Sequence, residues 1–234
     1  YFLLKNKVKE REKMDFKIEA MIGLFPILFK ALGLTLKITF ISTFISVLLG
    51  ILIAVIRFFK VKVLYQITGL FVSFFRGTPL LVQLFLIYYG LPQIFPVFIN
   101  MSAFVATVLG LSLHFSAYMA ETIRGALSSV DKGQIEAGYS VGMNTIQVMV
   151  RIVIPQGVRV AIPSIVNISI DLLKSSSLAF TLGLADIMAK TQLEAASSYR
   201  FLESYLAVAL VYWILVILLE RVQKILEIKL NRGY

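Results

Sequence analysis

The chain has 234 residues, of which 59% are hydrophobic and 15% are charged, and its mean hydropathy is +0.86. A soluble domain is about half apolar and about a quarter charged, so this composition predicts a polytopic membrane protein. The net charge is +10, but the basic residues cluster beside apolar runs, which indicates membrane orientation rather than nucleic-acid binding. With no cysteine and a single histidine, His114, the chain has neither a disulfide framework nor the residues for a thiolate or multi-histidine metal site.

The first 30 residues combine a basic arm with an amphipathic pattern. Met14 is a candidate start, and from there the apolar residues recur at helical spacing, with Asp15, Lys17 and Glu19 on the polar side and Pro26 near the end. We expect residues 1–30 to form an N-terminal arm and an interfacial helix that lies along the membrane surface before the first span.

Five apolar runs are long enough to cross a hydrocarbon core, which takes about 20 helical residues. They are Leu32–Ile56, Leu64–Tyr89, Ala103–Leu127, Val160–Ala185 and Leu206–Leu226. An odd number of spans places the termini on opposite sides. Lysines and arginines lie between spans one and two, between three and four, and after five, whereas the loop between two and three has no charge. The positive-inside rule therefore predicts a cytoplasmic C-terminus and an N-terminus outside.

Polar groups interrupt the second and fourth predicted spans at similar depth, near the bilayer middle. One is Arg76-Gly77-Thr78-Pro79 and the other is Asp171 with the run from Lys174 to Ser177. Glycine, proline and serine hydroxyls favour helix breaks, and broken helices at this depth suit the charged ends of a zwitterion. The candidate substrate-pathway residues are Arg76, Thr78, Asp171, Lys174, Ser175 and Ser176. The alternative is that Arg76 and Asp171 form a structural ion pair.

Residues 128–158 form the loop between the third and fourth spans, and they present a specific pattern to water. Turn residues and helix formers lead to Gly142, and a second helical stretch, Met143–Arg151, precedes Pro155. This pattern predicts two short helices with a hinge at Gly142, the first from about Gln134 to Asn144, and an end to the second at Pro155.

The sequence EAGYSVGMNTIQVMVRIVIP at 136–155 resembles the coupling loop of bacterial ABC importer permeases, whose signature is EAA, three residues, G, nine residues and I-x-L-P. Gly138 replaces the second alanine of that signature, and Ile154 replaces the leucine. The stretches RGTPLLVQLF, AYMAETIRGAL and LLKSSSLAF, in that order along the chain, resemble the polar amino acid branch of the family. A plain amphipathic loop is the alternative.

The resemblance implies an all-α integral membrane protein: a type I permease domain of five helices over residues 31–228, followed by a cytoplasmic tail, 229–234. It implies that the ATPase-coupling residues are Glu136, Ala137, Gly138, Gly142, Ile152 and Pro155. The implied partners are a cytoplasmic ATPase that binds ATP and Mg²⁺, a second permease subunit that is identical or paralogous, and an extracellular or periplasmic substrate-binding protein. The chain itself is expected to bind no cofactor, to catalyse no reaction and to lie in a bacterial cytoplasmic membrane.

The stretches SLAFTLGLADIMAKTQ and FLESYLAVALVYW look most like members that carry cystine or other sulfur amino acids. Relatives that carry basic amino acids often have an acidic residue where this chain has Ser175. Glutamine, glutamate or a basic amino acid remains the alternative cargo. A secondary transporter is the rival class, because midplane charges and broken helices suit it equally, although it has no evident use for the cytoplasmic helix pair.

Overall fold

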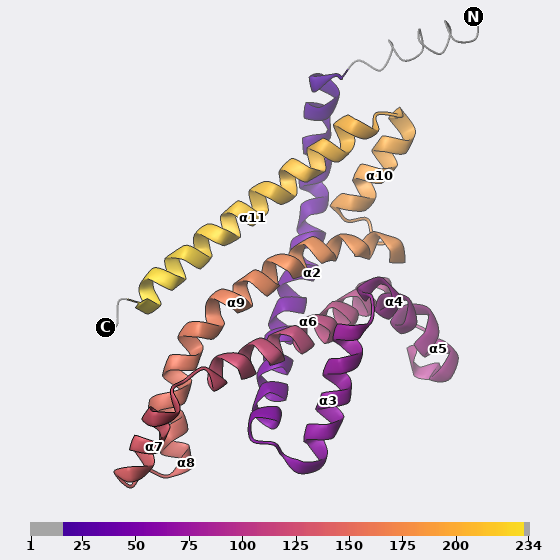
Figure 1. Cartoon of the computed structure of the whole chain (residues 1–234). Helices are drawn as coiled ribbons and strands as arrows, with labels where there is room; N and C mark the ends of the chain where they lie inside the picture. The colour runs from indigo at the N-terminus through magenta and orange to yellow at the C-terminus, as the bar shows by residue number, and fades with distance from the viewer. Residues whose placement is uncertain (1–15, 232–234) are drawn as a thin grey trace, which may run out of the picture.

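The computed structural model describes residues 16–231, and every regular element within that range is helical (Figure 1). Four of these helices are long and apolar enough to cross a membrane, or five if the bent pair formed by residues 62–77 and 80–94 counts as one span. The predicted all-helical membrane fold is thus confirmed. The expectations for Met14 and the basic arm lie outside the described residues.

The elements follow one another along the chain with short connections. They are α2 (Ile18–Phe58), α3 (Lys62–Gly77), α4 (Leu80–Phe85), a π-helical turn η1 (Leu86–Gly90), α5 (Leu91–Ile94), a 3₁₀ turn η2 (Pro96–Phe98), α6 (Ala103–Ser128), α7 (Lys132–Ser140), α8 (Thr145–Val148), a π-helical turn η3 (Met149–Val153), α9 (Ile154–Ser175), a 3₁₀ segment η4 (Ser176–Leu182), α10 (Ile187–Ser198) and α11 (Phe201–Asn231).

The structure joins the expected N-terminal helix to the first span. Helix α2 has 41 residues and passes through Pro26, so at 1.5 Å per residue it is roughly 60 Å long, about twice the hydrocarbon core. Its first half buries Leu24, Leu28 and Ala31 against Ile187 of α10 and apolar residues of α11. The buried side of the helix continues past residue 30 through Thr35, Ile38 and Ser42, so no break separates the two predicted elements.

Helices α2 and α6 form the centre of the fold, and small residues let them approach closely. Ser42 and Ser46 donate hydrogen bonds to the carbonyl oxygens of Val108 and Ser112, at 3.5 and 3.2 Å. A Cβ atom built on Gly50 would lie 2.8 Å from the Cβ of Met119. Small and hydroxyl-bearing residues at helix contacts are how membrane helices associate without a hydrophobic driving force.

The second span breaks where the sequence predicts it. Helix α3 ends at Gly77, Thr78 and Pro79 are extended, and the axis turns by 112° into the segment 80–94. The fourth span also changes at the predicted place, because α9 ends at Ser175 and continues as the 3₁₀ segment η4.

The prediction that Pro155 ends a helix is wrong. The helical path from Thr145 to Leu182 is continuous through Pro155, which occupies the first turn of α9. The π-helical turn η3 immediately precedes it. A wider turn at that point accommodates the ring and the missing amide, so the proline sits inside a long helix instead of stopping it.

Helix α10 is an element that apolar run length missed. It has 12 residues, is capped by Asp186 and lies beside α11, at the opposite end of the molecule from α7 and α8 (Figure 1). It is too short to be recognised as a span, although Ile187, Thr191 and Ala195 are buried.

Candidate functional site

The predicted hinge of the coupling loop is a tight turn set by local side chains. Asp131 caps α7 by accepting a hydrogen bond from the Gln134 amide at 3.2 Å. Helix α7 ends at Ser140, earlier than predicted, because Gly142 takes a left-handed conformation with φ of +81°. Asn144 then starts α8, where its side chain and that of Gln147 each bond the other's backbone amide. Glycine at a helix C-terminus followed by a capping box fixes the direction of both helices.

The residues of the signature occupy different places on this helix pair. Ala137, Gly138 and Ile152 line one shallow groove of about 410 Å³. Glu136, Gly142 and Pro155 are exposed and lie outside the lining of the groove. Exposed apolar side chains continue the surface, with Val141 76% and Ile146 74% exposed. The loop therefore presents both a groove and an apolar surface to its surroundings.

The coupling loop is packed onto the spans. A single buried cluster joins Val148 and Val153 of the loop to Ile123 and Leu127 of α6 and to Ala54 of α2. The Gln156 side-chain amide also donates to the Gln134 side-chain oxygen at 2.6 Å, which ties α9 to α7. The loop and the central helices therefore share one packed core.

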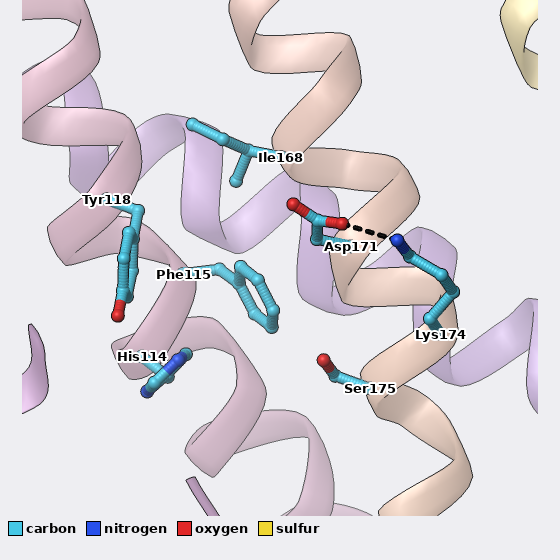
Figure 2. A pocket seen from close by; sticks show the side chains of 7 residues that line it. All are labelled: His114, Phe115, Tyr118, Ile168, Asp171, Lys174 and Ser175. Carbon is cyan, nitrogen blue, oxygen red and sulfur yellow. Dashed lines mark ion pairs between the residues drawn. The ribbon is translucent and has the colours of Figure 1, made fainter. Parts of the chain in front are cut away.

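A second candidate site is a cavity of about 550 Å³ between α6 and α9. Its lining residues are His114, Phe115, Tyr118, Ile168, Asp171, Lys174 and Ser175. In Figure 2 the Phe115 ring of α6 points towards α9, and a dashed line marks the ion pair between Asp171 and Lys174. The Asp171 carboxylate and the Lys174 ammonium are 2.7 Å apart. Both charged side chains are more than half exposed in the single chain. Three of the six predicted pathway residues, Asp171, Lys174 and Ser175, line this cavity.

Gln83 connects the broken second span to the cavity, and sequence reasoning missed it. The Phe75 carbonyl would normally accept from residue 79, but Pro79 has no amide hydrogen. The Gln83 side-chain nitrogen replaces that donor at 3.0 Å and also donates to the Thr78 hydroxyl at 2.8 Å. The Gln83 side-chain oxygen lies 2.9 Å from Nδ1 of His114. The sequence signal was an amide side chain four residues after Pro79, which itself stands two residues after Gly77.

Arg76, Thr78 and Ser176 lie beside the cavity and outside its lining. The Arg76 guanidinium lies over the Tyr118 ring, with 5.4 Å from its carbon to the ring centroid. Asp171 is paired with Lys174, so the alternative in which Arg76 pairs with Asp171 is wrong for the described chain. Ser176 is buried and donates to the Leu173 carbonyl at 2.7 Å. Because Tyr118 contacts Arg76 and also lines the cavity, the two predicted polar groups do lie close together.

Known proteins resemble this chain over almost its whole length. A probable amino-acid ABC transporter permease, PatM of Vibrio harveyi, is 56% identical over 221 residues, which is 94% of this chain and 99% of that protein. The L-cystine transport system permease TcyB of Bacillus subtilis is 40% identical over 181 residues, 76% of each chain. A solved chain described as an amino acid ABC transporter with histidines has 33% identity and a TM-score of 0.85, and the match covers 92% of this chain and 99% of that one.

The family match covers the coupling loop and all but the first of the described elements in full. Residues 46–232 match the family described as the binding-protein-dependent transport system inner membrane component. This range includes the helix pair at 132–153, the cavity between α6 and α9 and the break at Thr78. The chain belongs to this family, and it is an amino-acid ABC transporter permease.

Proposed function

We propose that this chain transmits ATP-driven motion from a cytoplasmic ATPase to a pathway for a polar amino acid across a bacterial cytoplasmic membrane. The family is the permease component of transporters that work with an ATPase and a substrate-binding protein. The carrying observation is the buried cluster that joins Val148 and Val153 of the coupling loop to α6 and α2. It provides a packed connection between the loop and α6, which lines the cavity.

In this proposal α7 docks in a groove of the ATPase. Glu136 is exposed on α7 and is available to bond near the edge of that groove, while Gly142 lets the backbone approach closely. Closure of two ATPase subunits on ATP and Mg²⁺ draws two such loops together. The packed helices then rock between outward and inward access. No covalent chemistry is assigned to this chain.

The charge balance of the cavity favours a substrate with no net charge. Asp171 and Lys174 neutralise each other, and each can exchange its partner for the opposite group of a zwitterion. A cationic amino acid would instead need an excess of carboxylates, and Asp171 is the one acid in the lining. L-Cystine is the first candidate, because the cystine permease TcyB is 40% identical. Glutamine, also uncharged overall, is the second.

A polar stripe on α9 supports a second permease subunit, identical or paralogous, across the pathway. Ser164, Asn167, Asp171 and Lys174 recur at helical spacing, and the last three are exposed in the single chain. Polar side chains at membrane depth face a water-filled path or protein in preference to lipid. We assign the coupling loop and the C-terminus to the cytoplasm and the N-terminus to the outside, as the positive-inside rule predicts.

The test is uptake into proteoliposomes that contain this chain with its ATPase and binding protein. We expect labelled L-cystine to accumulate in an ATP-dependent manner, with competition by glutamine and little competition by arginine. Asp171→Asn should raise the KM about tenfold or more, whereas Glu220→Gln, an exposed acid on α11, should leave it unchanged. Preferential uptake of arginine, or an unaltered KM in Asp171→Asn, would overturn the substrate assignment.

A further inference from the structure

A basic pocket lies where α2 ends, on the side of the molecule that also carries the coupling loop. Its volume is about 300 Å³, and its lining residues are Arg57, Phe58, Lys60, Tyr65, Arg124 and Ser128. They come from the end of α2, the turn after it, the first turn of α3 and the last two turns of α6. None of them belongs to the signature of the coupling loop or to the cavity between α6 and α9.

Two of the cations are held in place by one acid. The Arg57 Nε donates to the Glu121 carboxylate at 3.0 Å, and the Arg124 Nη2 donates to the same carboxylate at 2.8 Å. The Arg57 guanidinium also lies over the Tyr65 ring, 5.2 Å from its centroid. Both arginines are therefore positioned before any ligand binds, which lowers the cost of ordering them.

The pocket has positive charge left over. Arg57, Arg124 and Lys60 carry three positive charges against the single negative charge of Glu121. The Arg57 Nη1 is buried and has no hydrogen-bond partner among the described residues. Lys60 is exposed at the turn, in a left-handed conformation with φ of 51°, and no ion pair is recorded for it within residues 16–231. A tetrahedral oxyanion matches this set of donors.

Exposed apolar residues are the sequence neighbours of the residues that line the pocket. Phe59, Val61, Val63 and Leu64 are exposed by 49%, 44%, 68% and 45%, and all four belong to the turn and the first residues of α3. A free phosphate has no use for such apolar neighbours, whereas a phospholipid places acyl chains there when its headgroup enters the pocket.

We propose that this pocket binds a phosphate-bearing anion, and that the headgroup of an anionic phospholipid is its source. Arg57 and Arg124 contact the phosphate oxygens, Lys60 neutralises the remaining charge from the turn, and the exposed apolar neighbours hold the first part of the acyl chains. The proposed topology, with the coupling loop in the cytoplasm, places this pocket at the inner leaflet of the membrane. That placement rests on the proposed function, whereas the geometry of the pocket is independent of it. A lipid bound here would bridge α2, α3 and α6 next to the coupling loop.

The experiment measures binding of phosphatidylglycerol to the full chain in detergent by native mass spectrometry, with phosphatidylcholine and inorganic phosphate as separate probes. Lys60→Gln removes one pocket charge, and Lys62→Gln removes an exposed charge two residues away that does not line the pocket. We expect Lys60→Gln to weaken phosphatidylglycerol binding about fivefold, as one basic residue near a lipid surface predicts, and Lys62→Gln to have a smaller effect.

The probes separate the two sources of phosphate. Binding of phosphatidylglycerol that depends on Lys60, with weak binding of phosphatidylcholine and inorganic phosphate, supports the lipid site. Binding of inorganic phosphate that depends on Lys60, without preference for the lipid, supports the anion pocket and overturns its lipid source. The proposal is overturned if Lys60→Gln and Lys62→Gln bind phosphatidylglycerol equally well and Lys60→Gln does not weaken the binding of inorganic phosphate. Because transport is not measured, these outcomes are independent of the proposed substrate.

Discussion

Gly138 and Ile152 are in contact across the groove of the coupling loop. A Cβ atom built on Gly138 would lie 2.9 Å from Cδ1 of Ile152 and 3.1 Å from Cγ2 of Val148. The family signature has alanine at this position, and here the neighbouring side chains fill the space that its methyl group would take. The glycine and the two larger residues therefore form one packing unit.

Larger side chains at Gly138 are expected to separate α7 from α8. Gly138→Ala should be tolerated, because the end of the Ile152 side chain can rotate away. Gly138→Leu should destabilise the loop by about 1–3 kcal/mol, the usual cost of overpacking, and reduce recovery of the ATPase. The control is Gly125→Leu, since a Cβ atom there meets nothing within 4 Å. Thermal unfolding and ATPase co-purification are the measurements. Equal behaviour of the two leucine variants would contradict this packing account.

The contact between α2 and α6 predicts a strong effect at Gly50. Its added Cβ would meet the Cβ of Met119 at 2.8 Å and the Ala120 amide nitrogen at 3.3 Å, and backbone atoms cannot rotate away. Gly50→Leu should lower the melting temperature and the yield of folded protein. Gly33→Leu, on the same helix with nothing within 4 Å, should be neutral or slightly stabilising, because leucine is the better helix former. Similar melting temperatures for the two variants would be inconsistent with the close helix contact.

The hydrogen bonds of Gln83 predict a defect in transport without a defect in docking. Gln83→Leu leaves the Phe75 carbonyl without its donor and releases the His114 side chain. An unsatisfied buried polar group costs about 1–3 kcal/mol, so stability and substrate uptake should both fall, while the ATPase is still recovered. Gln93→Leu, at an exposed position of α5, is the matched control. Full uptake by Gln83→Leu would show that the hydrogen bonds of Gln83 are not needed for transport.

Asp186 predicts a pH-dependent stability. Its side chain is fully buried at the start of α10, and one carboxylate oxygen has no partner in the described chain. Burial raises the pKa of Asp186 from 3.8 to about 6. The folded state therefore holds the proton more tightly than the unfolded state, and this stabilising contribution is lost as the pH rises through about 6.

The variant that checks this is Asp186→Asn, which keeps a capping side chain and removes the charge. It should be more stable than the parent protein at pH 8, by up to about 3 kcal/mol from a shift of about two pKa units. The difference should shrink as the pH falls towards 5. Melting temperatures between pH 5 and 8 give the answer, and a difference that does not change with pH would contradict the buried charge.

The lengths of the apolar runs and the positions of glycine and proline predicted most of the helices. Apolar length placed α6 within one residue of its observed end, and Gly77 with Pro79 predicted the break after α3. The prediction at Pro155 failed for a local reason. A single proline is typical of a helix end, but the helix can continue where the preceding turn widens, as η3 does. Helix α10 was not predicted, because it is too short to be recognised from apolar run length and is stabilised by packing against α2 and α11.

The candidate sites also contain some residues that the sequence predicted and others that only the structure revealed. The predicted coupling residues follow from a local pattern, because the spacing of Glu136, Gly142 and Pro155 is read within one short stretch of sequence. The cavity depends on contacts across the fold, because Tyr118 and His114 of α6 share its lining with Asp171 of α9, more than 50 residues later. Such pairings are set by how helices pack, so Gln83 and Tyr118 became visible only in three dimensions.

The most direct test of the central claim is recovery of the ATPase from detergent-solubilised membranes by Gly142→Asp and Gly183→Asp. The two glycines have φ of +81° and +86° with open space around each, so aspartate strains both backbones equally. Only Gly142 lies in the coupling loop, and Gly183 is near α10 at the far end (Figure 1). The parent protein and Gly183→Asp should recover the ATPase and Gly142→Asp should not. Equal recovery by both variants, or none by the parent protein, would contradict the account.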